Sequence, residues 1–378
     1  MALISNGKTI DPAVRERPLI INGDMAVAQR ATSTSGIGAD TAFVVDRFAY
    51  RKGGTPSFRS TISQSTTVPT GQGFLTSLKV DCTTADASLS ASTRFGIDQK
   101  IEAQNLINLK QGTSSARATT LSFWVKSNLT GQFNIWIFKE DGTARSFVKA
   151  YTISSADTWE KKIINIDADT AAAGAIANDN GEGWRITWML AAGSTFSSGS
   201  IAASWENYTA ANIGVGQTNF GSSTDNEFFL TGVQLDVGTY DSTNLPDFPF
   251  ESFESNLRRC SRYYTSINQN GANGWRTFPG RINGTADVEN IGVTLSTFLR
   301  TGNPTVTKSG SCVAQVWDEN GYHATSAGGG TFSILTDSGN STPYLHCKQT
   351  GFTGLHNEGA GNISFVLGTP SIAVDAEL

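Results

Sequence analysis

The stretch that decides the fold class is residues 119–138, which reads TTLSFWVKSNLTGQFNIWIF. In its second half, Phe133, Ile135 and Ile137 occupy every other position. A period of two is typical of a strand with one buried face. Residues 121–125 are apolar on nearly both faces, which favours a strand in the middle of a sheet. The stretch therefore predicts two strands joined by a polar connection.

The same rhythm extends outward from this stretch over residues 18–246. Short apolar runs alternate with Gly, Ser, Thr and Asn clusters at intervals of about ten residues. No helical pattern intervenes, so the sequence predicts an all-β fold, most plausibly a jelly-roll β-sandwich. The strand candidates are Pro18–Gly23, Phe43–Tyr50, Phe74–Val80, Thr119–Lys126, Phe133–Phe138, Lys162–Ile166, Arg185–Leu190 and Phe228–Val237.

One segment breaks this rhythm and predicts a short helix over residues 249–265. Its apolar residues recur at steps of four, three and four, which places them on one stripe of a helix. Those residues are Phe253, Leu257, Cys260 and Tyr264. Two interpretations are open: the helix packs on one sandwich, or it links two domains and contributes this stripe to contacts near a subunit axis.

After the helix, the β pattern resumes in a smaller unit, which predicts a C-terminal β-sandwich domain. Its strand candidates are Asn290–Leu299, Pro304–Lys308, Cys312–Asp318, Thr331–Thr336, Asn362–Leu367 and Ser371–Ala376. The predicted organisation is an N-terminal arm or docking segment, a jelly-roll lectin-like domain, a linking helix and a C-terminal β domain. Their bounds are residues 1–17, 18–248, 249–265 and 266–378.

Composition and charge argue against several classes of protein. The chain has 378 residues, more than one hydrophobic core usually covers, so two domains are expected. A net charge of −5 gives no general reason to bind nucleic acid or an anionic membrane. No apolar run reaches the roughly 20 residues that span a bilayer, and no signal-peptide pattern opens the chain. We therefore expect a soluble protein that is made in a cytoplasm, with no nucleic-acid partner and no membrane insertion.

Residues that could carry chemistry are scattered. The three histidines, His323, His346 and His356, share no short metal-ligand spacing, and no nucleophile elbow is present. Residues 178–182, Asn-Asp-Asn-Gly-Glu, are rich in oxygen ligands; a tight Asn-Gly turn is favoured there over a Ca²⁺ loop. The cysteines are read as buried free thiols. We expect no enzyme activity, no catalytic residues, no metal and no cofactor.

Exposed aromatic residues are the better candidates for binding, because sugar rings stack on aromatic faces. Core packing is the default for any single aromatic residue. Trp275 and Arg276 are the exception, since they follow the turn-rich residues 270–274 and could be presented at a surface. Tyr322 and His323, which follow Glu-Asn-Gly, form a second loop candidate.

Several segments resemble those of phage tail-fibre and related virion proteins. That family typically reads GVQLEVG, then PFE, then a helix ending in Cys-x-Arg-Tyr-Tyr. This chain has Gly232–Gly238, Pro249–Glu251 and Cys260–Tyr264 in the same order. Four other segments are similar to parts of the family's sandwich, and a fifth to its end: Ile21–Met25, Val45–Phe48, Leu121–Lys126, Ala191–Phe196 and Ala373–Leu378.

The resemblance implies a carbohydrate-binding-module-like jelly roll, a linking helix and a C-terminal β domain in a homotrimer. It implies a phage virion protein of the tail-fibre type that attaches to a host-surface glycan or receptor. Other tail or capsid proteins would contact the arm and the sandwich. The alternative is a purely structural part, either a capsid decoration fibre or a tail-fibre adaptor. A third possibility, the binding module of a secreted polysaccharide-degrading enzyme, is disfavoured by the missing signal peptide.

Overall fold

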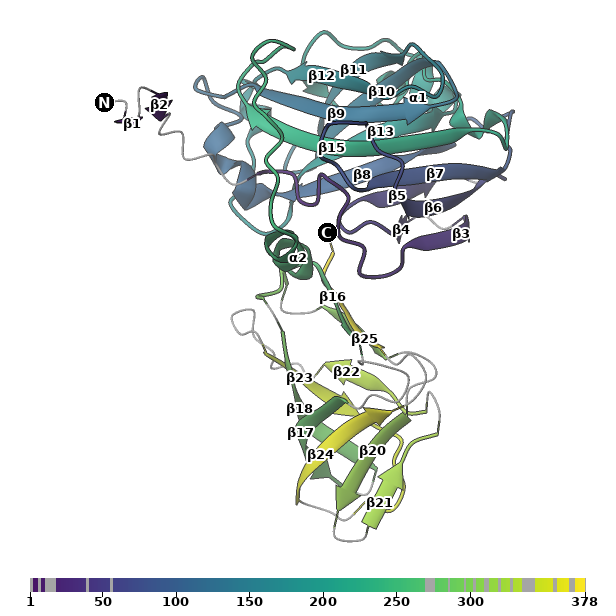
Figure 1. Cartoon of the computed structure of the whole chain (residues 1–378), viewed down its shortest axis with the longest axis vertical. Coiled ribbons are helices and arrows are strands. Elements are labelled where there is room, and N and C mark those ends of the chain that lie inside the picture. The colour runs from purple at the N-terminus through teal and green to yellow at the C-terminus, as the bar shows by residue number, and fades with distance from the viewer. Residues whose placement is uncertain are drawn as a thin grey trace. The chain divides into compact units, whose positions relative to one another are not determined.

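The computed structural model describes most of the chain in two units. The described residues are 3–5, 8–10, 18–38, 41–54, 57–268, 276–284, 286–295, 297–301, 304–308, 313–318, 321–326, 329–334, 344–355, 359–366 and 371–377. Unit 1 comprises Met1–Ala26, Ser33–Ala42 and Phe48–Phe250, and unit 2 comprises Val27–Thr32, Phe43–Arg47 and Glu251–Leu378. Each unit is built almost entirely from antiparallel β-sheet (Figure 1), which confirms the predicted all-β class.

Unit 1 is a β-sandwich of two sheets. In spatial order, sheet I contains β14 (Glu206–Asn207), β11 (Arg145–Ile153), β10 (Gly131–Lys139), β13 (Glu182–Ala192), β8 (Arg94–Glu102), β5 (Ala49–Gly53) and β4 (Thr41–Phe43). Sheet II contains β12 (Glu160–Ile166), β9 (Thr119–Ser127), β15 (Glu227–Val237), β7 (Ser77–Thr84), β6 (Arg59–Ser65) and β3 (Ser33–Ile37). The remaining elements are the hairpin β1 (Leu3–Ser5) and β2 (Lys8–Ile10), the α-helix α1 (Ser194–Ser197) and the 3₁₀ turns η1 (Ala103–Leu109), η2 (Ala172–Gly174), η3 (Ala210–Asn212) and η4 (Phe220–Ser222).

Aromatic side chains from both sheets form the core of unit 1. Phe123 of β9 packs edge-on against Trp188 of β13, with ring centroids 5.7 Å apart. Phe133 of β10 lies 6.1 Å from Phe228 of β15. All four are fully buried, and burying a side chain such as Phe stabilises a fold by about 1.5–3 kcal/mol. The alternation noted at Phe133 therefore corresponds to the core-facing side of β10.

The run Phe43–Tyr50 is not the single strand that its composition predicted. The structure ends β4 at Phe43 and starts β5 at Ala49, with a turn between them. Arg47 adopts a φ of 71°, a left-handed conformation that a continuous strand does not contain. The turn is apolar because Val44 and Val45 are buried, so its hydrophobicity reflects packing and not strand structure.

Unit 2 contains the helix α2 (Phe253–Ser261) and two sheets. Sheet III contains β16 (Tyr264–Asn268), β25 (Ser371–Asp375) and β19 (Thr305–Lys308). Sheet IV contains β21 (Gly321–Ala324), β20 (Val313–Asp318), β24 (Gly359–Val366), β17 (Arg276–Asn283), β18 (Asp287–Thr294), β23 (Tyr344–Gln349) and β22 (Phe332–Ile334). Ile372 and Val374 of sheet III share one buried cluster with Val288 and Ile363 of sheet IV.

The helix α2 buries a different stripe from the one expected. Ser252 caps its start by accepting a hydrogen bond from Ser255 N at 3.2 Å. Phe253 is 60% exposed, whereas Arg259 is buried and pairs with Glu251. The spacing of apolar residues did not predict the burial of Arg259. An ion pair such as that with Glu251 allows an arginine to occupy a buried position.

The rest of the expected stripe is divided between two elements. Leu257 is half-buried and Cys260 is buried in α2, but Tyr264 belongs to β16. Cys82, Cys260 and Cys347 are free and buried. Within the described ranges, no helix is both long and apolar enough to cross a bilayer.

Candidate functional site

Sheet I carries charged side chains on the face opposite the core. Ile97 and Ile186 are fully buried on the core side of β8 and β13. Because side chains alternate across a strand, their neighbours Asp98 and Arg185 point from the other face. The strand register places Asp98 opposite Thr187 and Arg185 opposite Lys100. Residues far apart in the sequence therefore form one cluster on this side of the sheet, in which Asp98, Thr187 and Arg185 are largely buried.

These residues form a connected set of ion pairs and hydrogen bonds, named the polar floor here. Its members are Arg51, Asp98, Lys100, Glu182, Arg185 and Thr187. Thr187 Oγ1 donates to Asp98 Oδ1 at 2.7 Å, and Arg51 Nε lies 2.8 Å from Asp98 Oδ2. The Glu182 carboxylate lies 2.8 Å from Lys100 Nζ and 2.7 Å from Arg185 Nη2.

A β-bulge explains how Glu182 reaches this face. The pairing of β13 with β8 shifts between Glu182 and Trp184. Without the shift, Glu182 would point to the same side as Trp184 and Ile186, which are buried in the core. A bulge adds one residue and reverses the alternation. The carboxylate is thereby turned toward the two cations that it pairs with.

Burial shapes the charges of the polar floor. It raises the pKa of the Asp98 carboxyl above the usual range, opposed first by Arg51 and then by the Thr187 hydrogen bond. Burial likewise lowers the pKa of the Lys100 ammonium, opposed by Glu182. Since unpaired charges are costly in such a place, the pairs hold each side chain in a fixed orientation.

An aromatic wall borders the polar floor. It consists of Phe138 and Tyr208, whose ring centroids are 5.4 Å apart and which are both half-buried. The Arg185 guanidinium carbon lies 5.4 Å from the Phe138 ring centroid. Beneath the wall, Trp136 and Ile213 belong to a small buried cluster that covers this end of the sheet. Phe138 and Tyr208 of the wall therefore pack on buried side chains.

The polar floor retains hydrogen-bonding capacity. Among the described residues, Arg51 Nε, Arg185 Nε and Glu182 Oε1 are buried and make no well-aligned hydrogen bond, although their charges are paired. Leaving such atoms unsatisfied costs free energy. These buried atoms are not accessible to a ligand, but the Arg51 side chain of the same set is 31% exposed and can exchange hydrogen bonds with hydroxyls. A flat ring that carries hydroxyls could lie against Phe138 at the same time.

The residues singled out from the sequence lie elsewhere. Trp275 is outside the described residues, and Arg276 starts β17, where its backbone pairs with Phe365. Tyr322 and His323 are neighbours in β21; Tyr322 is 47% exposed, and His323 Nδ1 lies 3.0 Å from Thr353 O. Tyr322 is thus on a surface, and its role in binding stays a prediction.

Oxygen, nitrogen and sulfur side-chain atoms are the possible ligands for a metal ion among the described residues. In the parts of the chain that the structure describes, no group of three or more His, Cys, Asp or Glu side chains is placed to hold a metal ion. The Asn-Asp-Asn-Gly-Glu segment is a turn, in which Asp179 Oδ1 accepts a hydrogen bond from Gly181 N at 2.8 Å.

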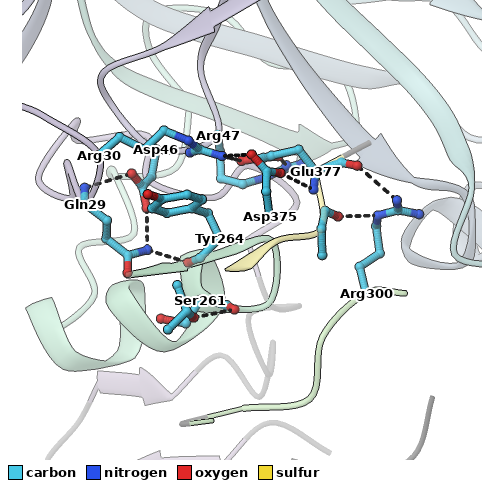
Figure 2. A network of polar contacts seen from close by, with 11 residues as sticks. Gln29, Arg30, Asp46, Arg47, Ser261, Tyr264, Arg300, Asp375 and Glu377 are labelled. Atoms are coloured by element: carbon cyan, nitrogen blue, oxygen red, sulfur yellow. Dashed lines mark hydrogen bonds and ion pairs between the residues drawn. The ribbon is translucent and has the colours of Figure 1, made fainter. Parts of the chain in front are cut away.

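A separate polar network lies within unit 2 and connects three distant segments (Figure 2). Asp46 accepts hydrogen bonds from Gln29 N at 2.9 Å and from Gln29 Nε2 at 2.6 Å. Gln29 Nε2 also donates to Tyr264 O at 2.7 Å. Arg300 Nε donates to Ala376 O at 2.8 Å.

Two arginines complete this network. Arg30 Nη2 lies 3.0 Å from Asp375 Oδ2, and its guanidinium carbon is 3.6 Å from the Tyr264 ring centroid. Arg47 pairs with Glu377, and its guanidinium carbon is 3.4 Å from the Tyr263 ring centroid. These ion pairs and hydrogen bonds join the segments 27–32 and 43–47 to the C-terminal part of unit 2.

Sequence reasoning missed the polar floor. Its residues are dispersed over β5, β8 and β13, and no local spacing connects them. One signal was present: Asp98 and Lys100 alternate with Ile97 and Ile101, which places two charges on one face of a single strand. The partner strand could not be identified without the register.

Comparisons with known proteins gave only distant structural similarities. No family model matches the chain. No curated protein matches it either. The tailspike protein 4 enzymatically active domain of Bacteriophage CBA120 is 14% identical with a TM-score of 0.31, over 58% of this chain and 21% of that one. The family 11 carbohydrate-binding module of Clostridium thermocellum, in complex with a β-1,3-1,4-mixed-linked tetrasaccharide, is 11% identical with a TM-score of 0.29, over 55% and 98%.

A third structural match covers residues of both units. It is the tandem carbohydrate-binding-module domain CBM22-1–CBM22-2 of Paenibacillus barcinonensis Xyn10C. It is 10% identical with a TM-score of 0.28, over 96% of this chain and 91% of that one. These similarities concern the β-sandwich fold alone.

Proposed function

We propose that this chain is a carbohydrate-binding virion protein of the phage tail-fibre type, and that the outer face of sheet I holds the sugar. The observation that carries the proposal is the polar floor beside the aromatic wall. Arg185 belongs to the polar floor, and its guanidinium group contacts Phe138 of the aromatic wall. Binding, and not catalysis, is proposed for this face.

Carbohydrate recognition needs two kinds of contact that this face offers together. The C–H face of a sugar ring packs against an aromatic ring, as Phe138 or Tyr208 could provide. Its hydroxyls exchange hydrogen bonds with charged side chains, each worth about 1.5–3 kcal/mol. Because Arg51 and Arg185 are already oriented by their partners, little side-chain entropy is lost on binding.

The virion role and the homotrimer rest on the resemblance of the motif segments to tail-fibre proteins. Three copies on one fibre would multiply weak single-site affinities by avidity, which suits attachment to a repetitive glycan on a host surface. The arm, residues 1–17, and unit 1 are the parts proposed to contact other tail or capsid proteins. The purely structural alternative needs the same fold and the same trimer but no sugar site.

The test measures binding of the purified full chain to surface polysaccharide extracted from host cells. Phe138→Ala and Arg185→Met each remove one of the two contacts, and we expect each to weaken binding about 10- to 150-fold, from a loss of about 1.5–3 kcal/mol. Lys149→Ala, which changes an exposed residue of β11, is the matched control. Thermal melts verify that each variant is folded.

Two further outcomes separate the alternatives. Loss of binding in Tyr322→Ala, with Phe138→Ala unaffected, would move the site to β21, the second candidate. No binding to any host polysaccharide, with antibody label on the capsid or tail body in electron microscopy, would favour the structural role. Sedimentation of the purified chain as a monomer would contradict the homotrimer.

A further inference from the structure

Sheet II also carries an unusual set of side chains on the face opposite the core. Phe123 and Phe228 face the core, so Trp124, Lys126 and Phe229 point the other way. Phe229 lies next to Lys126 in the register of β15 with β9 and next to Lys79 in its register with β7. Lysine and aromatic residues therefore alternate across three neighbouring strands.

A second row lies beside the first. Lys161 of β12 pairs in register with Trp124 of β9. Trp159, just before β12, lies 6.1 Å from Phe229 between ring centroids, at an interplanar angle of 63°. The lysine–tryptophan face is defined here as Lys79, Trp124, Lys126, Trp159, Lys161 and Phe229. All six residues belong to unit 1.

The aromatic rings of this face are held in place. Lys126 Nζ lies 4.6 Å and Lys79 Nζ 5.7 Å from the Phe229 ring centroid, within cation–π range. Trp124 packs against Gly232, where a Cβ atom would lie 2.9 Å from Trp124 Cδ1. Gly232 has a φ of 62°, so glycine is required there for two reasons.

The charges on this face are not balanced. Lys79 lies 2.5 Å from Glu227 and 3.5 Å from Asp81. Lys126 and Lys161, by contrast, form no ion pair with any described residue. Lys161 is exposed, and Trp124 and Trp159 are half-buried. Two cations and two indole rings are therefore available to a partner.

We propose that the lysine–tryptophan face is a second binding site, for an anionic polysaccharide. Ammonium groups pair with carboxylate, sulfate or phosphate substituents, and the indole faces pack on the sugar rings that carry them. An acidic peptide would use the lysines but has no regular need for two flat aromatic surfaces. This site is independent of the one proposed on sheet I, since the two occupy outer faces of different sheets.

The test measures binding of the full chain to immobilised dextran sulfate, with neutral dextran and poly-glutamate as the comparison probes. Lys126→Gln with Lys161→Gln, and separately Trp124→Ala with Trp159→Ala, are each expected to weaken dextran sulfate binding about tenfold or more. Lys110→Gln with Lys149→Gln removes two exposed lysines elsewhere on unit 1 and is expected to leave it unchanged. Phe138→Ala is also expected to have no effect, which separates this site from that on sheet I.

Three results would overturn the proposal. The first is equal weakening by the control lysine pair, which would mean that binding follows overall charge alone. The second is unchanged binding in the tryptophan pair together with full competition by poly-glutamate, which would indicate an acidic protein partner. The third is wild-type binding to dextran sulfate no stronger than to neutral dextran.

Discussion

Replacing Asp46 by Asn should remove a pH dependence from the stability of unit 2. Asp46 is 1% exposed, and its carboxylate accepts two hydrogen bonds from Gln29. Burial raises the pKa of Asp46 from 3.8 to about 6, against the opposing effect of these hydrogen bonds and of Arg30. The folded state therefore binds a proton more tightly at this site than the unfolded state does.

The direction and size of the stability change with pH follow from proton linkage. Between pH 3.8 and 6 the folded chain holds more protons, so the contribution of Asp46 to stability is full below pH 3.8 and is lost as pH rises through about 6. The complete effect is about 3 kcal/mol, since a tenfold change in proton affinity corresponds to about 1.4 kcal/mol. Between pH 7 and pH 4.5 the same linkage gives about 2 kcal/mol.

Amide hydrogen exchange can isolate this effect, because it reports the opening free energy of chosen segments. Peptides covering β16 and β25 are compared at pH 4.5 and pH 7, after correction for intrinsic exchange rates. On going from pH 7 to pH 4.5, the opening free energy of these segments should rise by about 2 kcal/mol more in the wild type than in Asp46→Asn. Asp375→Asn, which removes a more exposed carboxylate of the same network, is the control and should retain the gain.

An equal pH response in the wild type and in Asp46→Asn would show that Asp46 does not cause the pH dependence. It would mean that the Asp46 carboxylate is stabilised by Gln29 and Arg30 as fully as it is in water. Loss of the response in Asp375→Asn would instead assign the pH dependence to the arginine pairs of the network.

Three further predictions concern unit 1 and are checked by urea unfolding followed by tryptophan fluorescence. Tyr151→Phe should stabilise the fold by about 1–2 kcal/mol, because the buried Tyr151 hydroxyl makes no hydrogen bond within the described residues; a loss of stability would contradict this. Gly23→Ala should destabilise by about 2 kcal/mol or more, since a Cβ atom would lie 2.1 Å from Val233 O; an unchanged midpoint would be unexpected. Arg145→Met should cost about 3–5 kcal/mol, because it leaves the buried Asp169 without its partner at 2.5 and 2.9 Å; a loss below 1 kcal/mol would show that water reaches Asp169.

The sequence was sufficient for features that depend on local periodicity. Alternation at Phe133, Ile135 and Ile137 correctly predicted β10 and its core-facing side. The helix was also predicted, but not the stripe that it buries. Spacing placed Phe253 inside, yet it is exposed, and Arg259 is buried by its pair with Glu251. Ion pairs made by the fold can thus override a hydrophobic pattern.

The polar floor could not be predicted, because its geometry depends on strand register. Asp98 and Thr187 are 89 residues apart and meet only when β8 pairs with β13. The bulge that redirects Glu182 leaves no clear mark in the sequence. The segments that resemble tail-fibre proteins could be recognised in the sequence, but the contacts that they make could not be predicted. Arg47 and Glu377, separated by 330 residues, form an ion pair.

The central claim is that the outer face of sheet I binds carbohydrate. A crystal structure of the full chain, soaked with the shortest host-surface oligosaccharide that binds it, tests this most directly. The expected result is a sugar ring packed on Phe138, with its hydroxyls at Arg51 and Arg185. A sugar bound at Tyr322, with the polar floor empty, would contradict it.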